Sequence, residues 1–224
     1  MIETFLGQVD SRLHSRSGAV FYSGRTAFTQ PADVYILGLN PGGSPERRPH
    51  ETLSRHMAKV LAEVPDLWSE YTDESWDGDI PGRHGMQPRL IHMLDTLNLD
   101  PRRVPASNVV FVRSTSEAAL AAEKQELLRR CWPVHDMVIR NLGIKVIVCL
   151  GGTAGRWVRE ALEANEPVDR FVEANGRRWT SEAHANASGQ YVLTLTHPGR
   201  ADWRNPKADP TPLVQKILAL KQPR

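Results

Sequence analysis

Short apolar runs alternate with amphipathic stretches along this chain. The runs at residues 34–37, 108–113, 145–150 and 191–196 are rich in Val, Ile and Leu, which predicts four buried strands. Helical spacing of apolar residues predicts helices at residues 2–13, 52–64, 88–97, 117–130, 133–142, 154–164 and 212–221. This alternation of strands and helices predicts an α/β fold, a three-layer α/β/α sandwich around a mostly parallel four-stranded sheet.

Residues 170–182 carry the pattern of a β-hairpin, with Asn175-Gly176 expected at its turn. The sequence contains no internal repeat, low-complexity tract or interdomain linker. A length of 224 residues suffices for one well-packed domain, so we expect a single domain over residues 1–224.

Composition adds little to this picture but excludes some classes of protein. Hydrophobic residues make up 40% of the chain and charged residues 24%, which is typical of a soluble globular protein. No run approaches the roughly 18 apolar residues of a membrane span, and the amino terminus lacks a signal-peptide pattern. We therefore expect a cytoplasmic protein that does not contact a membrane.

Charge is distributed unevenly along the chain, although the net charge is only +2. Residues 60–79 contain seven acidic residues and no Lys or Arg. Residues 197–224 contain six basic residues against two acidic ones, a balance of +4. This asymmetry suits one surface that faces a polyanion, although solvated faces give similar counts.

The two cysteines do not suggest a metal or redox site. Cys131 falls at a predicted helix start and Cys149 in a predicted buried strand, and neither belongs to a metal-ligand spacing. Two thiols cannot supply a four-cysteine iron–sulfur cluster. We expect structural thiols, no metal and no cofactor.

The first and last predicted strands both end in a polar residue followed by Pro and Gly. Gly38-Leu39-Asn40-Pro41-Gly42 follows the first strand, and His197-Pro198-Gly199 follows the last. Such segments are simple turns in many proteins, but the carboxyl ends of parallel strands are also where α/β folds build their sites. A histidine there can donate a hydrogen bond to developing negative charge, while a capping or packing role is the alternative.

Two other patterns point less clearly to chemistry. Gly151-Gly152-Thr153-Ala154-Gly155 lies between a strand and a helix, but it matches neither a P-loop nor a dinucleotide fingerprint, so we interpret it as a tight turn. Ser44 and Ser114 follow strands and could serve a Ser-His-Asp hydrolase with His197. No G-x-S-x-G segment supports that hypothesis.

Several segments, in order, resemble the uracil-DNA glycosylase superfamily. Residues 38–42 resemble its first motif, closest to the Gly-x-Asn-Pro-Gly form of the mismatch-specific and single-strand-selective branches. His197-Pro198 resembles the start of the second motif. Residues 107–113 are similar to the strand whose asparagine reads the uracil edge, and residues 131–133 and 144–151 are similar to the family's central helix and strand.

The resemblance implies roles for individual residues. Asn40 would position the attacking water, His197 would stabilise the departing uracil anion, and Asn108 would pair with the uracil edge. An amide orients water but does not take its proton, so we expect slower chemistry than in branches with Asp. The remaining implied base-pocket residues are the four around Asn40 and an aromatic chosen from the acidic segment: Gly38, Leu39, Pro41, Gly42, and Trp68, Tyr71 or Trp76.

The chain also departs from the family pattern. Gly42 occupies the position where a bulky Tyr often excludes thymine, so discrimination against thymine does not follow. The second motif reads His-Pro-Gly-Arg, which leaves the duplex wedge unassigned, with Arg200 and Trp203 as candidates. We expect Arg204 and Lys207 to join them on the DNA backbone.

The sequence therefore predicts a metal-independent, monomeric DNA glycosylase that removes uracil from DNA. Two alternatives remain open. A catalytically silent member would bind nucleic acid without cutting, and an unrelated α/β hydrolase would act on free nucleotides.

Overall fold

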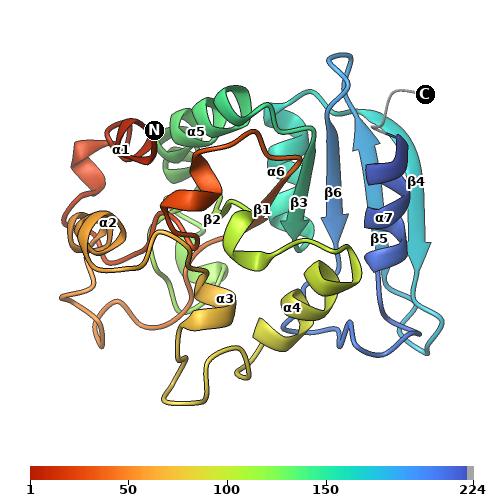
Figure 1. The fold of residues 1–224 in the computed structure, drawn as a ribbon, viewed down its shortest axis with the longest axis horizontal. Coiled ribbons are helices and arrows are strands. Elements are labelled where there is room, and N and C mark those ends of the chain that lie inside the picture. The colour runs from red at the N-terminus through yellow and green to blue at the C-terminus, as the bar shows by residue number, and fades with distance from the viewer. Residues whose placement is uncertain (221–224) are drawn as a thin grey trace.

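The computed structural model describes residues 1–220, which form one six-stranded sheet with helices on both faces (Figure 1). The strand order is β2-β1-β3-β6-β5-β4. The strands are β1 (Val34–Gly38), β2 (Ala106–Asn108), β3 (Val146–Leu150), β4 (Glu166–Val172), β5 (Thr180–Ala185) and β6 (Tyr191–Leu195). The α-helices are α1 (Ile2–Leu6), α2 (Leu53–Ala62), α3 (Glu70–Asp73), α4 (Gln87–Thr96), α5 (Lys124–Leu142), α6 (Gly152–Ala161) and α7 (Thr211–Leu220).

The sheet has a parallel part and an antiparallel part. β2, β1, β3 and β6 are parallel, as predicted, and the hairpin of β5 and β4 adds two antiparallel strands beside β6. The expectation of a four-stranded sheet is therefore wrong in its count, because β5 pairs with β6 through Glu182 and Thr194. Asn175 and Gly176 lie in the hairpin loop, as predicted, and the residue of the loop with a positive φ is Arg178, at 51°.

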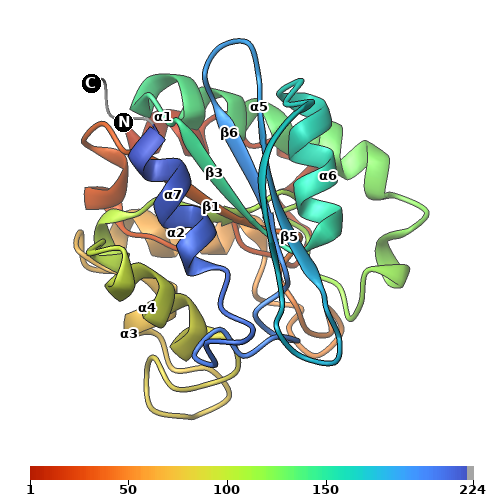
Figure 2. The ribbon, with the colours of Figure 1, turned by 90° about the vertical axis from the view of Figure 1, so that its right-hand side faces the viewer.

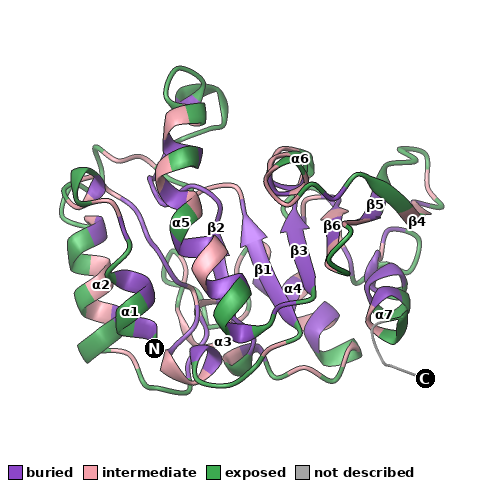
Figure 3. Ribbon diagram, turned by 90° about the horizontal axis from the view of Figure 1, so that it is seen from above, coloured by how far each residue is buried: buried purple, intermediate pink, exposed green. Residues whose placement is uncertain are grey.

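Alternate residues of the central strands pack into two separate cores. One core combines the strand residues with α5 and α6 on one face, and the other combines them with α4 and α7 on the opposite face. Figure 3 shows the buried strands between these helices. The strand residues of the first core include Tyr35, Leu37, Ile147, Cys149 and Val192, and those of the second include Ile36, Val148, Leu193 and Leu195. Both cysteines are fully buried here, which confirms the structural interpretation.

Helix α5 departs most from the sequence expectation. Two helices, 117–130 and 133–142, were expected to meet at Pro133, but one helix runs from Lys124 to Leu142 through this proline. Proline removes one N–H from the helix, yet the apolar face of α5 is buried against the sheet, and this packing outweighs the local break. No helix among residues 1–220 is long and apolar enough to cross a membrane.

Strand β2 is shorter and earlier than predicted. Regular pairing with β1 ends at Asn108, opposite Gly38, so the predicted strand at 108–113 is misplaced. The next residues stay beside the chain that follows β1, because the backbone N–H of Val109 donates to Gly38 O at 2.9 Å and that of Val110 donates to Leu39 O at 2.8 Å. This path brings residues 112–114 next to Asn40.

Candidate active site

The parallel strands deliver Asn40 and His197 to the same edge of the sheet at the same height. Pairing of β1 with β3 and of β3 with β6 puts Leu37, Cys149 and Thr194 on one level. Asn40 and His197 each come three residues after that level. Because one strand separates β1 from β6, the two backbone positions lie about 10 Å apart.

The side-chain amide of Asn40 has one fixed orientation. Its Nδ2 donates to Pro41 O at 2.9 Å, to Ser114 Oγ at 2.9 Å and to Val112 O at 3.4 Å. Carbonyl oxygens only accept, and Ser114 Oγ donates its own proton to Ser116 O at 2.8 Å, so the nitrogen must face this side. Oδ1 has no hydrogen-bond partner among residues 1–220, which leaves it free to accept a bond from a water.

Arg113 fixes the loop that follows Asn40. Its Nη1 donates to Gly42 O at 2.5 Å, its Nη2 to Glu51 at 2.6 Å and its Nε to Ser17 at 3.2 Å. The side chain is only 9% exposed, so these bonds are largely shielded from water. The sequence alone indicated no role for Arg113 and suggested Ser114 only as a possible nucleophile, because their contacts with the Asn40 loop join residues more than 70 positions apart.

Asn108 lies over Gly38, and its amide nitrogen has no hydrogen-bond partner within residues 1–220. A Cβ at position 38 would collide with Asn108 Oδ1, so glycine is required there. The Asn108 side chain is 4% exposed, and Nδ2 is fully buried without a partner in the described part of the chain. An unpaired buried amide costs about 1–3 kcal/mol, which a ligand can recover. Burial raises the pKa of the neighbouring Tyr22, whose hydroxyl also interacts with the Asn108 amide.

His197 is held as a neutral donor. Its Nδ1 accepts a hydrogen bond from the backbone N–H of Gly199 at 2.9 Å, so the ring proton resides on Nε2. Burial lowers the pKa of His197 below its ordinary value, and the charge of Arg200 lowers it further. The imidazole packs against Gly151, whose φ of 109° suits glycine. Nε2 has no partner within residues 1–220.

A partly buried arginine and a buried tryptophan hold the His197 loop in place. Arg89 Nη1 donates to Pro198 O at 2.5 Å, and Trp203 Nε1 donates to Thr196 O at 3.2 Å. Trp203 is 0% exposed and belongs to the core on the α4 and α7 face. The expectation that Trp203 contacts DNA is therefore corrected, because its ring is enclosed by the protein.

Two of the three expected base-stacking aromatics, Trp68 and Tyr71, are core residues, whereas Trp76 is only partly buried. Trp68 is 5% exposed and Tyr71 only 1% exposed. Tyr71 packs edge-on against Tyr22 and Trp76, with ring centres 5.9 Å and 6.2 Å apart. Lys59 Nζ lies 5.7 Å from the centre of the Trp68 ring. The assignment of Trp68 or Tyr71 as a stacking partner is thus wrong, since neither offers an accessible face.

The expected DNA-contacting cations behave differently. Arg200, Arg204 and Lys207 are all exposed. Arg204 pairs with Asp202 at 2.9 Å, whereas Arg200 and Lys207 have no ion pair within residues 1–220. Their contact with DNA stays a prediction. Lys221 and Arg224, which contribute to the basic balance of the sequence, lie outside the described residues.

The competing motifs do not assemble into a second site. Gly155 packs against Thr194 of β6 so closely that a Cβ would collide with it, which confirms that residues 151–155 join helix to sheet. Ser44 Oγ donates to Glu46 at 2.6 Å. Neither Ser44 nor Ser114 bonds to His197 in the described region, so the serine-hydrolase arrangement is not formed.

Comparison with known families agrees with this geometry. The model of the uracil DNA glycosylase superfamily matches residues 26–220, which include both loops, Asn108 and the parallel strands. None of the curated proteins compared with the chain matches it. The chain belongs to the uracil DNA glycosylase superfamily, whose members are generally DNA glycosylases.

Proposed function

We propose that this superfamily member is a DNA glycosylase that hydrolyses the N-glycosidic bond of uracil in DNA. One observation carries the proposal. Asn40 Oδ1, Asn108 Nδ2 and His197 Nε2 have no hydrogen-bond partner among residues 1–220, whereas the other ring nitrogen of His197 and the amide nitrogen of Asn40 are bonded. Polar groups that are oriented but unused on one edge of a sheet suit a polar substrate.

Asn40 would act on the attacking water. Cleavage of the glycosidic bond passes through an oxocarbenium-like state, which needs a water held near the sugar carbon. Oδ1 of Asn40 can accept one hydrogen bond from that water, and Ser114, Pro41 and Val112 keep the amide from rotating. Because an amide does not remove the proton, the step relies on orientation and on stabilisation of the leaving group.

His197 and Asn108 would act on the base. The departing uracil carries negative charge, and a neutral imidazole with its proton on Nε2 can donate to it. The Asn108 amide offers one donor and one acceptor, which matches the carbonyl and N–H groups on the uracil edge. Gly42 has open space where a side chain would stand, so uracil is proposed without a claim that thymine is excluded.

The DNA strand would run along the exposed cations beside His197. Arg200 and Lys207 carry charges that are not neutralised within the described chain, and Arg204 shares its charge with Asp202. Contacts of this kind position a nucleic acid through its phosphates without reading sequence.

Incubation with labelled oligonucleotides that carry one uracil, single-stranded and double-stranded, tests the proposal. Alkali then cleaves any abasic site. We expect cleavage by the wild-type protein, and loss of about 100-fold or more in rate for Asn40→Ala and His197→Ala. Thymine-containing strands of the same sequence measure the discrimination that Gly42 permits.

Three outcomes would contradict this function. Binding of DNA without abasic product would favour a catalytically silent member. Release of base from free nucleotides but not from DNA would favour a nucleotide hydrolase. Full activity of both variants would show that the residues named here do not carry the chemistry.

A further inference from the structure

The antiparallel hairpin of β4 and β5 brings its tip to the loop that carries His197. β5 pairs with β6 so that Glu182 lies opposite Thr194, and the same register continued for three residues places Trp179 opposite His197. Figures 1 and 2 both show the tip beside the chain that follows β6. The tip, residues 173–179, is therefore a neighbour of the candidate active site.

Hydrogen bonds fasten this tip to the second-motif loop. The backbone N–H of Ala174 donates to Lys207 O at 2.8 Å, and Arg177 Nη1 donates to Arg200 O at 2.6 Å. Arg177 is held from its other side by Glu173, with Nη2 and Oε2 separated by 3.0 Å. Glu173 is 0% exposed, so the ion pair anchors the tip from within.

Trp179 is the exposed aromatic of this surface. It is 38% exposed and is the one aromatic among the large exposed hydrophobic residues of residues 1–220. The Arg177 guanidinium lies 4.4 Å from the centre of the indole ring. Because Glu173 and Arg200 O restrain that guanidinium, one face of the indole is supported before any ligand arrives, which lowers the entropy lost on binding.

Arg178 adds an unpaired cation beside the indole. Its side chain is exposed and makes no ion pair with any described residue. Its φ of 51° lies in the left-handed region, where Arg is disfavoured relative to Gly. Arg178, on the tip, and Arg200 and Lys207, on the loop to which the tip is bonded, thus carry positive charges that make no ion pair within residues 1–220.

We propose that Trp179 and Arg178 form a DNA-contact surface, in which Trp179 stacks on a base next to the extruded nucleotide and Arg178 contacts a phosphate. An aromatic face flanked by free cations is the combination that binds exposed bases and their backbone. The proposal rests on the proposed function for the identity of the substrate as DNA. It assigns to Trp179 the role that the buried Trp203 cannot perform.

Fluorescence anisotropy with uracil-free single-stranded DNA and with a duplex containing an abasic site tests the stacking. We expect Trp179→Ala to weaken binding about tenfold and Trp179→Phe, which keeps an aromatic face, by less than about threefold. Leu61→Ala is the matched control, because Leu61 is equally exposed at 38% but lies on α2. Equal affinity of Trp179→Ala and wild type, with unchanged melting temperature, would overturn the proposal.

Salt dependence tests the phosphate contact. Arg178→Gly removes the charge and suits the positive φ, so we expect no loss of stability but a salt slope smaller by about one unit. Lys145→Ala removes an exposed charge at the opposite edge of the sheet, one that makes no ion pair within residues 1–220, and should leave the slope unchanged. An Arg178→Gly slope equal to that of wild type would contradict the contact.

The same experiments separate the two proposals. Binding that depends on Trp179 in a protein without excision activity would uphold this surface and reject the proposed function. Excision of uracil by a protein whose DNA affinity is unchanged by Trp179→Ala and Arg178→Gly would uphold the proposed function and reject this surface.

Discussion

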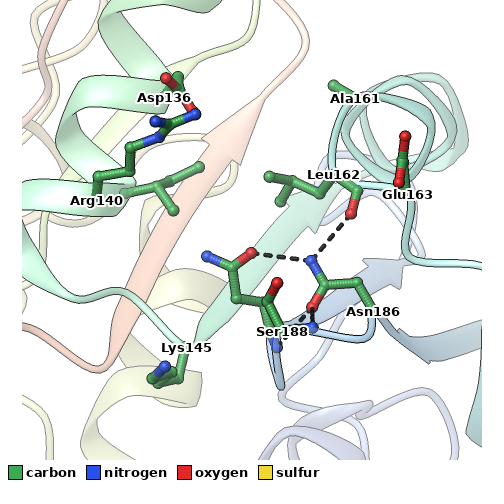
Figure 4. A pocket seen from close by; sticks show the side chains of 10 residues that line it. Asp136, Arg140, Lys145, Ala161, Leu162, Glu163, Asn186 and Ser188 are labelled. Atoms are coloured by element: carbon green, nitrogen blue, oxygen red, sulfur yellow. Dashed lines mark hydrogen bonds and ion pairs between the residues drawn. The ribbon is translucent and has the colours of Figure 1, made fainter.

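Two asparagines at opposite edges of the sheet show what distinguishes a site from a scaffold. Asn186 lies in a hollow of about 420 Å³ at the amino-terminal edge of the parallel strands (Figure 4). Its Nδ2 donates to Leu162 O and Gln190 Oε1, both at 2.9 Å, and its Oδ1 accepts from the backbone N–H groups of Ser188 and Gln190. Asn40, at the carboxyl edge, uses only its nitrogen.

The difference is one of satisfied against unsatisfied polar atoms. In the hollow at the amino-terminal edge, Arg140 also pairs with Asp136 at 2.9 Å, so Asn186 and Arg140 both use their polar atoms in contacts within the protein (Figure 4). At the carboxyl edge the fold orients Asn40, Asn108 and His197 and leaves one atom of each without a hydrogen-bond partner among the described residues. The volume of a hollow therefore says less about function than the hydrogen bonds that its lining leaves unmade.

The largest expected effect falls on the carboxyl edge. His197→Ala should lower the rate of uracil excision by about 100-fold, because the departing base loses a positioned donor. Asn186→Ala serves as the control and should excise uracil at the wild-type rate. Single-turnover assays of both variants make the comparison, and a similar loss in both would remove the distinction between the edges.

The free energy of unfolding should be affected more by Asn186→Ala than by His197→Ala, the opposite of the order expected for the excision rate. Asn186→Ala leaves two backbone N–H groups and a carbonyl without their partner, so we expect it to lower the free energy of unfolding by about 1–3 kcal/mol. His197→Ala should change that free energy by less than about 1 kcal/mol, because it loses one bond at a half-exposed position. Urea denaturation measures both, and equal destabilisation would break the comparison.

Low pH should destabilise the protein through a buried histidine, His135, that packs beneath the carboxyl edge of the sheet. His135 is fully buried, with Nδ1 bonded to the Tyr35 hydroxyl and Nε2 to Val109 O, next to Asn108. Burial lowers the pKa of His135 from 6.5 to about 4, so its contribution is complete above pH 6.5 and is lost as pH falls toward 4. We expect about 1 kcal/mol of stability lost per pH unit in that window.

A matched variant isolates this histidine. His135→Gln keeps one acceptor and one donor but does not titrate, so its melting temperature should fall less steeply between pH 6.5 and 4.5. Burial also lowers the pKa of His56, to about 3, which leaves a residual slope in the variant. An identical pH dependence of variant and wild type would show that His135 is not responsible.

The smallest effect concerns the residue that orients Asn40. Ser114→Ala removes one of three acceptors of Asn40 Nδ2, so the amide becomes less well held. We expect the excision rate to fall about fivefold while DNA affinity stays unchanged, since the bond contributes about 1 kcal/mol. Ser116→Ala keeps the carbonyl that Ser114 uses and is the control. A rate within twofold of wild type would argue against this orienting role.

The sequence predicted most of the parallel sheet because its strands are self-contained apolar runs. β1, β3 and β6 fall within a residue or two of their predicted ranges. β2 was misplaced because residues 109–113 are equally apolar but pair outside the regular ladder, and apolarity does not encode pairing. The count of strands failed because the hairpin and β6 were both predicted but the pairing of β5 with β6 was not.

Some residues of the candidate site could likewise be predicted from the sequence and others could not. Asn40, Asn108 and His197 follow strands in recognisable segments, so local sequence identified them. Trp203 and Trp179 both stand beside basic residues, and only tertiary packing buries the first at 0% exposure and leaves the second 38% exposed. Residues that act through distant contacts, such as Ser114 on Asn40, carry no local signal.

The excision rate of Asn40→Ala under single-turnover conditions, with DNA affinity measured on the same preparation, tests the central claim most directly. If the free oxygen of Asn40 positions the attacking water, the variant should bind uracil-containing DNA within about threefold of wild type and release uracil at least 100-fold more slowly. A rate within tenfold of wild type would contradict the account.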